Sequence, residues 1–126
     1  MKKCNFFLAT PYGVVVSVFS NEKHIPKEVE EKLEEPGTLL GLTWQDDDDN
    51  FSIKVWINPR LSKRLADKKV DEYCKEELDC IAVHEAVHVK QFIEEATSAQ
   101  LDNETEAYLT SFIFKNIRKL ATQQAN

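Results

Sequence analysis

Short apolar segments follow one another through the first half of the chain. Phe6 to Ala9 and Val14 to Phe19 are rich in β-branched or aromatic residues and are separated by a turn that contains Pro and Gly, which is typical of strands. Thr38 to Trp44 and Phe51 to Asn58 flank an acidic run, and every second residue of the latter is phenylalanine, isoleucine or valine. This period of two predicts a β-hairpin.

The acidic run from Asp46 to Asn50 lies between the two segments of this hairpin. It lacks the Gly and the distal Glu that a calcium-binding loop has at fixed offsets. We therefore interpret it as the solvated tip of the hairpin.

Helical spacing dominates the second half, after a short amphipathic helix predicted for Ile25 to Glu35. A short helix is expected from Arg60 to Lys69, and Asp71 is placed to cap a long helix from Glu72 to about Thr97. After a polar break, a last helix carries apolar residues at helical spacing: Tyr108, Leu109, Phe112, Ile113, Ile117 and Leu120. Strands first and helices last predict an α+β fold, in which a mostly antiparallel sheet packs against C-terminal helices. At 126 residues we expect one domain, 1–126.

Composition narrows the classes of protein that the chain can represent. The net charge is −6 and no stretch gathers the basic residues, so nucleic acid is not an expected partner. No apolar run approaches the roughly 20 residues of a membrane span, and no signal peptide is recognisable, so we expect a soluble cytoplasmic protein. Cys4, Cys74 and Cys80 are interpreted as free thiols, the last two as small buried residues of the long helix.

The long helix carries the residues with the clearest chemistry, in the motif HExxH. His84 and His88 are four residues apart, so both imidazoles leave the same helix face and can bind one metal ion, with zinc the best match. Glu85 is rotated by about 100° from His84, which suits a base acting on a metal-bound water. The motif can arise by accident, but its apolar flanks predict a buried helix, where ionisable groups need partners.

A third metal ligand is expected from the acidic residues near the start of the last helix. Asp102, Glu104 and Glu106 are all candidates by residue type. Asn103 and Glu106 have the spacing of a capping box, which would give Glu106 a structural role, and Asp102 could also cap the helix. This reasoning favours Glu104 without removing the others.

At these residues the chain resembles the gluzincins, zinc peptidases in which an HExxH helix is joined by a Glu from a following helix. The segment from Glu104 to Tyr108 is similar to the second motif of this class, and together the motifs resemble small metallopeptidase-like proteins of phages and prophages. The resemblance implies one zinc ion bound by His84, His88 and Glu104, with Glu85 catalytic.

The resemblance also implies an edge strand that crosses above the zinc and pairs with an extended peptide, and Phe51 to Asn58 is the expected strand. Tyr108 stands where many gluzincins carry Asp or Asn, and we expect its ring to pack in the core. No residue is assigned as oxyanion donor.

Three hypotheses follow. The first is a zinc-dependent hydrolase that cleaves an extended segment of a protein partner, for which a host protein is one candidate, and the expected location is the host cytoplasm if the chain is phage-encoded. The second is a phage-type zinc-binding protein that binds or inhibits a host factor without catalysis. The third is a metal-free structural module.

Overall fold

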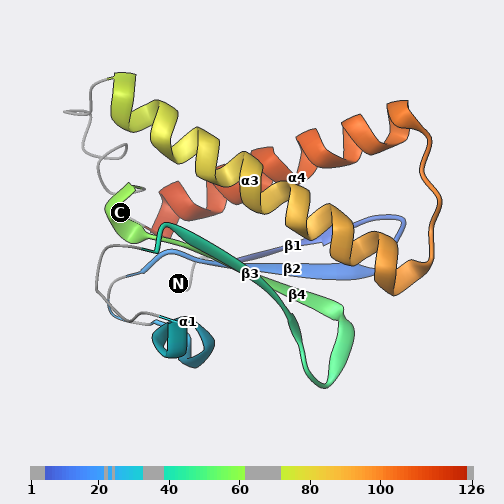
Figure 1. Ribbon diagram of the computed structural model, residues 1–126, viewed down its shortest axis with the longest axis horizontal. Coiled ribbons are helices and arrows are strands. Elements are labelled where there is room, and N and C mark those ends of the chain that lie inside the picture. Colours follow the sequence, from blue (N-terminus) through green and yellow to red (C-terminus); the bar gives the residue numbers. More distant parts are fainter. Residues whose placement is uncertain (1–4, 22, 24, 33–38, 62–71, 125–126) are drawn as a thin grey trace.

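Four strands form one sheet with the order β1-β2-β4-β3. The computed structural model describes residues 5–21, 23, 25–32, 39–61 and 72–124. Strand β1 (Phe6–Ala9) is antiparallel to β2 (Val14–Phe19), β2 is parallel to β4 (Asp49–Ile57), and β3 (Gly41–Asp46) is antiparallel to β4. Figure 1 shows this sheet beneath two long helices, which confirms the predicted α+β fold with its mostly antiparallel sheet.

The expected edge strand is not the observed one. Phe51 to Asn58 falls within β4 and just beyond its end, and β4 lies between β2 and β3, so the sequence prediction is wrong at this point. Ile53, Val55 and Ile57 are fully buried, and Trp56 on the other face is only 2% exposed. The last three residues of β4 are thus buried on both faces, which suits an interior strand better than an edge strand. Strand β3, half-buried along its length, forms the edge next to β4, and β1 forms the other edge.

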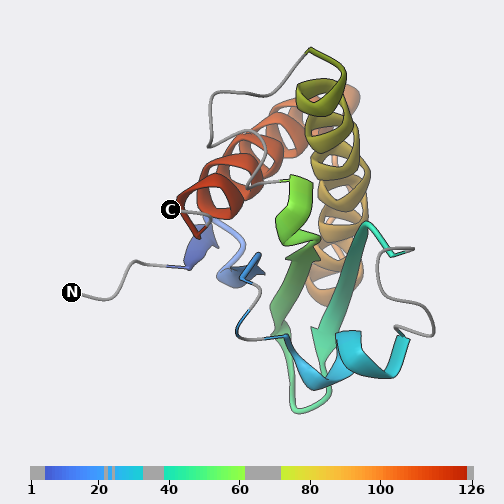
Figure 2. The same cartoon turned by 90° about the vertical axis from the view of Figure 1, so that its left-hand side faces the viewer.

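Two helices cover one face of the sheet. Helix α3 (Glu72–Thr97) lies over β3 and β4, and α4 (Asn103–Gln124) lies over β1 and β2. The short α1 (Lys27–Lys32) lies on the other side, as Figures 1 and 2 show. Within the described residues, no helix has an uncharged apolar stretch long enough to cross a membrane.

Several helix boundaries were predicted closely and others fall outside the described residues. The long helix has the expected bounds. The helix expected from Ile25 to Glu35 is described only as Lys27–Lys32, and residues 33–38 lie outside the described part. Of the helix expected from Arg60 to Lys69, residues 59–61 are helical and residues 62–69 are not described.

The core forms where the inward residues of the sheet meet the inward faces of α3 and α4. On β2 the buried residues alternate, and on the helices they recur every three or four positions, as the sequence periods predict. On β4, Ile53, Val55 and Ile57 alternate in the same way, and Trp56 is buried on the other face. Fully burying each such aliphatic side chain is worth about 1.5–3 kcal/mol. The largest fully buried residues are Ile53, Ile57, Leu78, Ile93, Ile113 and Ile117.

Two expected core residues are exposed. Cys80 is at the surface, because the buried face of α3 passes through Leu78 and Ala82, and Cys80 lies between them on the opposite side. Tyr108 is 70% exposed and lines a shallow surface pocket beside the turn between β1 and β2. Both predictions of burial are therefore wrong. Cys4 and the side chain of Cys74 lie outside the described part.

Candidate metal site

Helix α3 holds two imidazole rings next to each other on its surface. His84 and His88 are one helical turn apart, and the Nε2 atoms of the two rings are 3.1 Å apart. The ring planes cross at 74°. His84 is exposed and His88 is half-buried, and the neighbouring Val83 is 44% exposed. The apolar flanks therefore do not bury this part of the helix on every side, and one flank faces solvent.

The distance between the two nitrogens fits a shared metal ion. Zinc lies about 2.0–2.1 Å from an imidazole nitrogen, so one ion bound to both requires nitrogens no more than about 4 Å apart. The observed 3.1 Å meets this condition. One carboxylate oxygen of Glu85 joins the pair, and all three ligand atoms lie within 4.8 Å of one another. His84, Glu85 and His88 could therefore hold a metal ion.

Glu85 is buried although the two histidines of the motif are not. It is only 3% exposed, and its Oε1 accepts a hydrogen bond of 3.0 Å from the Thr43 hydroxyl. Burial raises the pKa of the Glu85 carboxyl above its usual value, because the charged form loses hydration. The hydrogen bond from Thr43 and the charges of the two imidazoles act in the opposite direction. A carboxyl with a raised pKa is better matched to proton transfer near neutral pH.

The carboxylate of Glu85 packs directly against the edge strand. A Cβ added at Gly41 would lie 3.0 Å from Oε2 and 3.1 Å from Cγ of Glu85, and 3.0 Å from Cγ2 of Ile81. These separations are tighter than ordinary van der Waals contact. Gly41 therefore allows β3 to approach α3 closely enough for Thr43, on the same face of the strand, to reach the carboxylate.

Replacing Gly41 by alanine is expected to lower the free energy of unfolding by about 1–3 kcal/mol, the usual cost of overpacking. Because two of the three close atoms belong to Glu85, part of this loss should disappear when Gly41→Ala is made together with Glu85→Ala. Urea unfolding of the two single variants and the double variant measures the coupling. Strictly additive losses would show that the Cβ does not meet the carboxylate.

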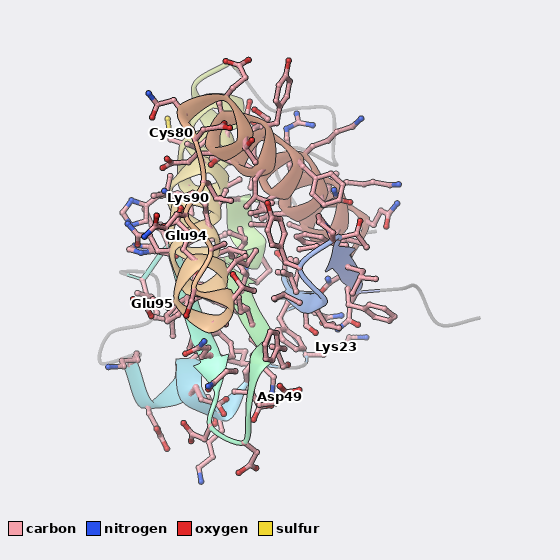
Figure 3. The ribbon with its side chains drawn as sticks, turned by 90° about the vertical axis from the view of Figure 1, so that its right-hand side faces the viewer. Lys23, Asp49, Cys80, Lys90, Glu94 and Glu95 are labelled. Carbon is pink, nitrogen blue, oxygen red and sulfur yellow. The ribbon has the colours of Figure 1, made fainter. Side chains whose placement is uncertain are left out.

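Glu106, an acidic residue of α4, contacts α3 away from the two imidazoles. Glu106 forms an ion pair with Lys90, whose Nζ is also 3.4 Å from Oε1 of Glu94; Figure 3 shows Lys90 and Glu94 along α3. Glu106 raises the pKa of Lys90 above its usual value through this hydrogen bond. Lys90 is two positions after His88, so the two side chains point about 200° apart around the helix. Glu106 therefore contacts the flank of α3 opposite the imidazoles.

Glu104 lies exposed in the first turn of α4. Within the described residues, the group of ligand atoms around the imidazoles does not extend to it. Its role as third ligand stays a prediction.

The start of α4 is capped by Asp102. The backbone N–H of Thr105 donates to Oδ1 of Asp102 over 2.7 Å, and this hydrogen bond lowers the pKa of the aspartate. The capping box predicted for Asn103 and Glu106 is not formed, because Asp102 takes the capping position one residue earlier and the Glu106 carboxylate is paired with Lys90.

Three residues of the site were missed by sequence reasoning. Thr43 and Gly41 come from a strand about 40 residues before the motif, and no local pattern marks them. Oε1 of Gln91 accepts a hydrogen bond of 3.2 Å from Nδ1 of His88. Its position three residues after His88 was a usable signal, since residues at this spacing on a helix are neighbours.

No protein-family model, curated protein or solved structure matches this chain.

Proposed function

We propose that the chain is a zinc-dependent metallopeptidase-like protein of the gluzincin type, which hydrolyses a peptide bond in an extended protein segment. The observation that carries this proposal is the pair of Nε2 atoms 3.1 Å apart, with a buried carboxylate on the next residue of the same helix. Imidazole pairs at this spacing suit zinc, and a carboxylate beside them suits proton transfer.

Each residue of the motif has a separate role in this proposal. A zinc ion held by His84 and His88 would supply Lewis acidity and a water whose pKa is lowered to about 7. Glu85 is the base that takes a proton from the attacking water, and the resulting carboxylic acid protonates the leaving amine. The hydrogen bond from Thr43 fixes the orientation of the carboxylate for both transfers. We propose Glu104 as the third ligand, since Glu106 is already paired with Lys90.

An extended peptide fits the edge of the sheet. Among the described residues β3 pairs only with β4, so its outer edge offers backbone N–H and C=O groups to a further strand. The same strand contacts Glu85 through Gly41 and Thr43. A peptide added at this edge would lie close to the base, which supports a protein or peptide substrate.

Replacing Glu85 by glutamine is expected to leave the zinc content near one ion per chain and to lower the cleavage rate by at least about 100-fold, because the base is removed while both imidazoles stay. Elemental analysis measures the zinc, and mass spectrometry of a pool of unstructured peptides measures cleavage. A wild-type chain without zinc would contradict the proposal.

Cleavage at the original rate by Glu85→Gln would show that another group is the base. The same variant also distinguishes the proposed peptidase from the alternative, which is a phage-type zinc-binding protein that binds a host factor without catalysis. Such a protein would bind zinc, cleave no peptide in the pool, and keep its host-factor binding in Glu85→Gln.

A further inference from the structure

The ring nitrogen of His88 that faces away from His84 has a partner on the same helix. Nδ1 of His88 lies 3.2 Å from Oε1 of Gln91, one turn further along α3. An amide oxygen carries no hydrogen and can only accept, so the proton of this hydrogen bond belongs to Nδ1. Neutral imidazole has one N–H, and Nε2 of His88 is then left with a free lone pair.

This lone pair is directed to the place where a metal is expected. Nε2 of His88 faces Nε2 of His84 at 3.1 Å, and only a deprotonated Nε2 can bind a metal. In the metal-free chain the hydrogen between the two Nε2 atoms must therefore come from His84. The contact with Gln91 thus decides which nitrogen of His88 is available.

Among the described residues, no carboxylate accepts a hydrogen bond from Nδ1 of His88. The outer N–H of a metal-binding histidine normally donates its hydrogen bond to a carboxylate, a backbone carbonyl or water. Tyr108, at the place where the resemblance predicts an orienting Asp or Asn, instead lies against the turn between β1 and β2. Gln91 is exposed and makes no contribution to the core, so its contact with His88 is not a by-product of packing.

We propose that Gln91 is a positioning residue of the metal site, which fixes the Nδ1–H tautomer of His88 and thereby presents Nε2 to the metal. The proposal rests on the metal-binding part of the proposed function and is independent of peptide cleavage.

Two variants and a matched control test this role. Gln91→Ala removes the acceptor, Gln91→Glu replaces the amide oxygen by a carboxylate oxygen that can also accept, and Glu95→Ala changes another exposed residue of α3, labelled in Figure 3. Zinc affinity is measured by competition with a chromophoric chelator. Gln91→Ala should weaken binding by about 10-fold to 100-fold, the range found for lost outer partners of metal-binding histidines. Gln91→Glu should restore the affinity, and Glu95→Ala should not change it.

The tautomer is read directly in the metal-free chain by two-bond ¹H–¹⁵N correlation of the imidazole rings. His88 should carry its proton on Nδ1 in the wild type and in Gln91→Glu, and should move toward Nε2–H in Gln91→Ala. Unchanged zinc affinity in Gln91→Ala, or Nε2–H in the wild type, would overturn the proposal. If the wild type binds no zinc, the proposed function fails, and the tautomer measurement still decides the role of Gln91.

Discussion

Replacing His88 by alanine is expected to reduce bound zinc from near one ion per chain to near zero and to abolish peptide cleavage. The Nε2 atoms of the two imidazoles are 3.1 Å apart, and without His88 only His84 and Glu85 are left of the group of described residues that could hold a metal ion. A metal that binds only the folded chain stabilises it, so added zinc should raise the melting temperature of the wild type and leave that of His88→Ala unchanged. Elemental analysis and thermal unfolding measure the two effects.

Val87→Ala is the matched control, because Val87 is exposed on α3 next to His88 and carries no ligand atom. It should keep its zinc. A His88→Ala protein that still binds one zinc ion per chain would contradict the assignment of His88 as a zinc ligand. Elemental analysis of Glu104→Gln and Glu106→Gln identifies the third ligand. We expect Glu104→Gln to lose bound zinc and Glu106→Gln to keep it.

Replacing Ile113 by alanine is expected to lower the free energy of unfolding by about 2–5 kcal/mol. Ile113 is fully buried near the middle of α4, within the core cluster between the two helices and the sheet. Removing its outer carbons forfeits their burial and leaves a cavity that surrounding residues of two helices and a sheet cannot fill by small movements. Urea unfolding followed by circular dichroism measures the change.

Ser111→Ala, an exposed position two residues earlier on the same helix, provides the control and should stay within about 0.5 kcal/mol of the wild type. An equal loss of unfolding free energy in both variants would show that any substitution in α4 destabilises the helix. The loss would then not come from its buried face. A loss below about 1 kcal/mol in Ile113→Ala would contradict the core position of the residue.

The helices and strands were predictable from the sequence because the repeat of apolar residues that marks each one lies within that element. Alternation in β2 and β4 and helical spacing in α3 and α4 each occur within one element, and they are enough to identify it. The order of strands was not predictable in this way. Strand β4 pairs in parallel with β2, and this pairing joins segments more than 30 residues apart along the chain.

The same distinction applies to the site. The spacing of His84, Glu85 and His88 was sufficient to identify them, because a single helix brings them together. The contacts of Thr43 with Glu85 and of Glu106 with Lys90 depend on how separate elements pack. Residue types near the start of α4 show that carboxylates are present, and only the packing decides which of them meets α3.

The alternation of side chains in β3 gives protein engineers two independent sets of positions within one short strand. Gly41 and Thr43 face α3 and hold the carboxylate of Glu85, whereas Leu42 and Trp44 face the other side, where Trp44 stacks on Phe19. Libraries restricted to the second set would therefore change the far face of the edge strand and leave the contacts of Glu85 in place. Libraries at the first set would change those contacts directly.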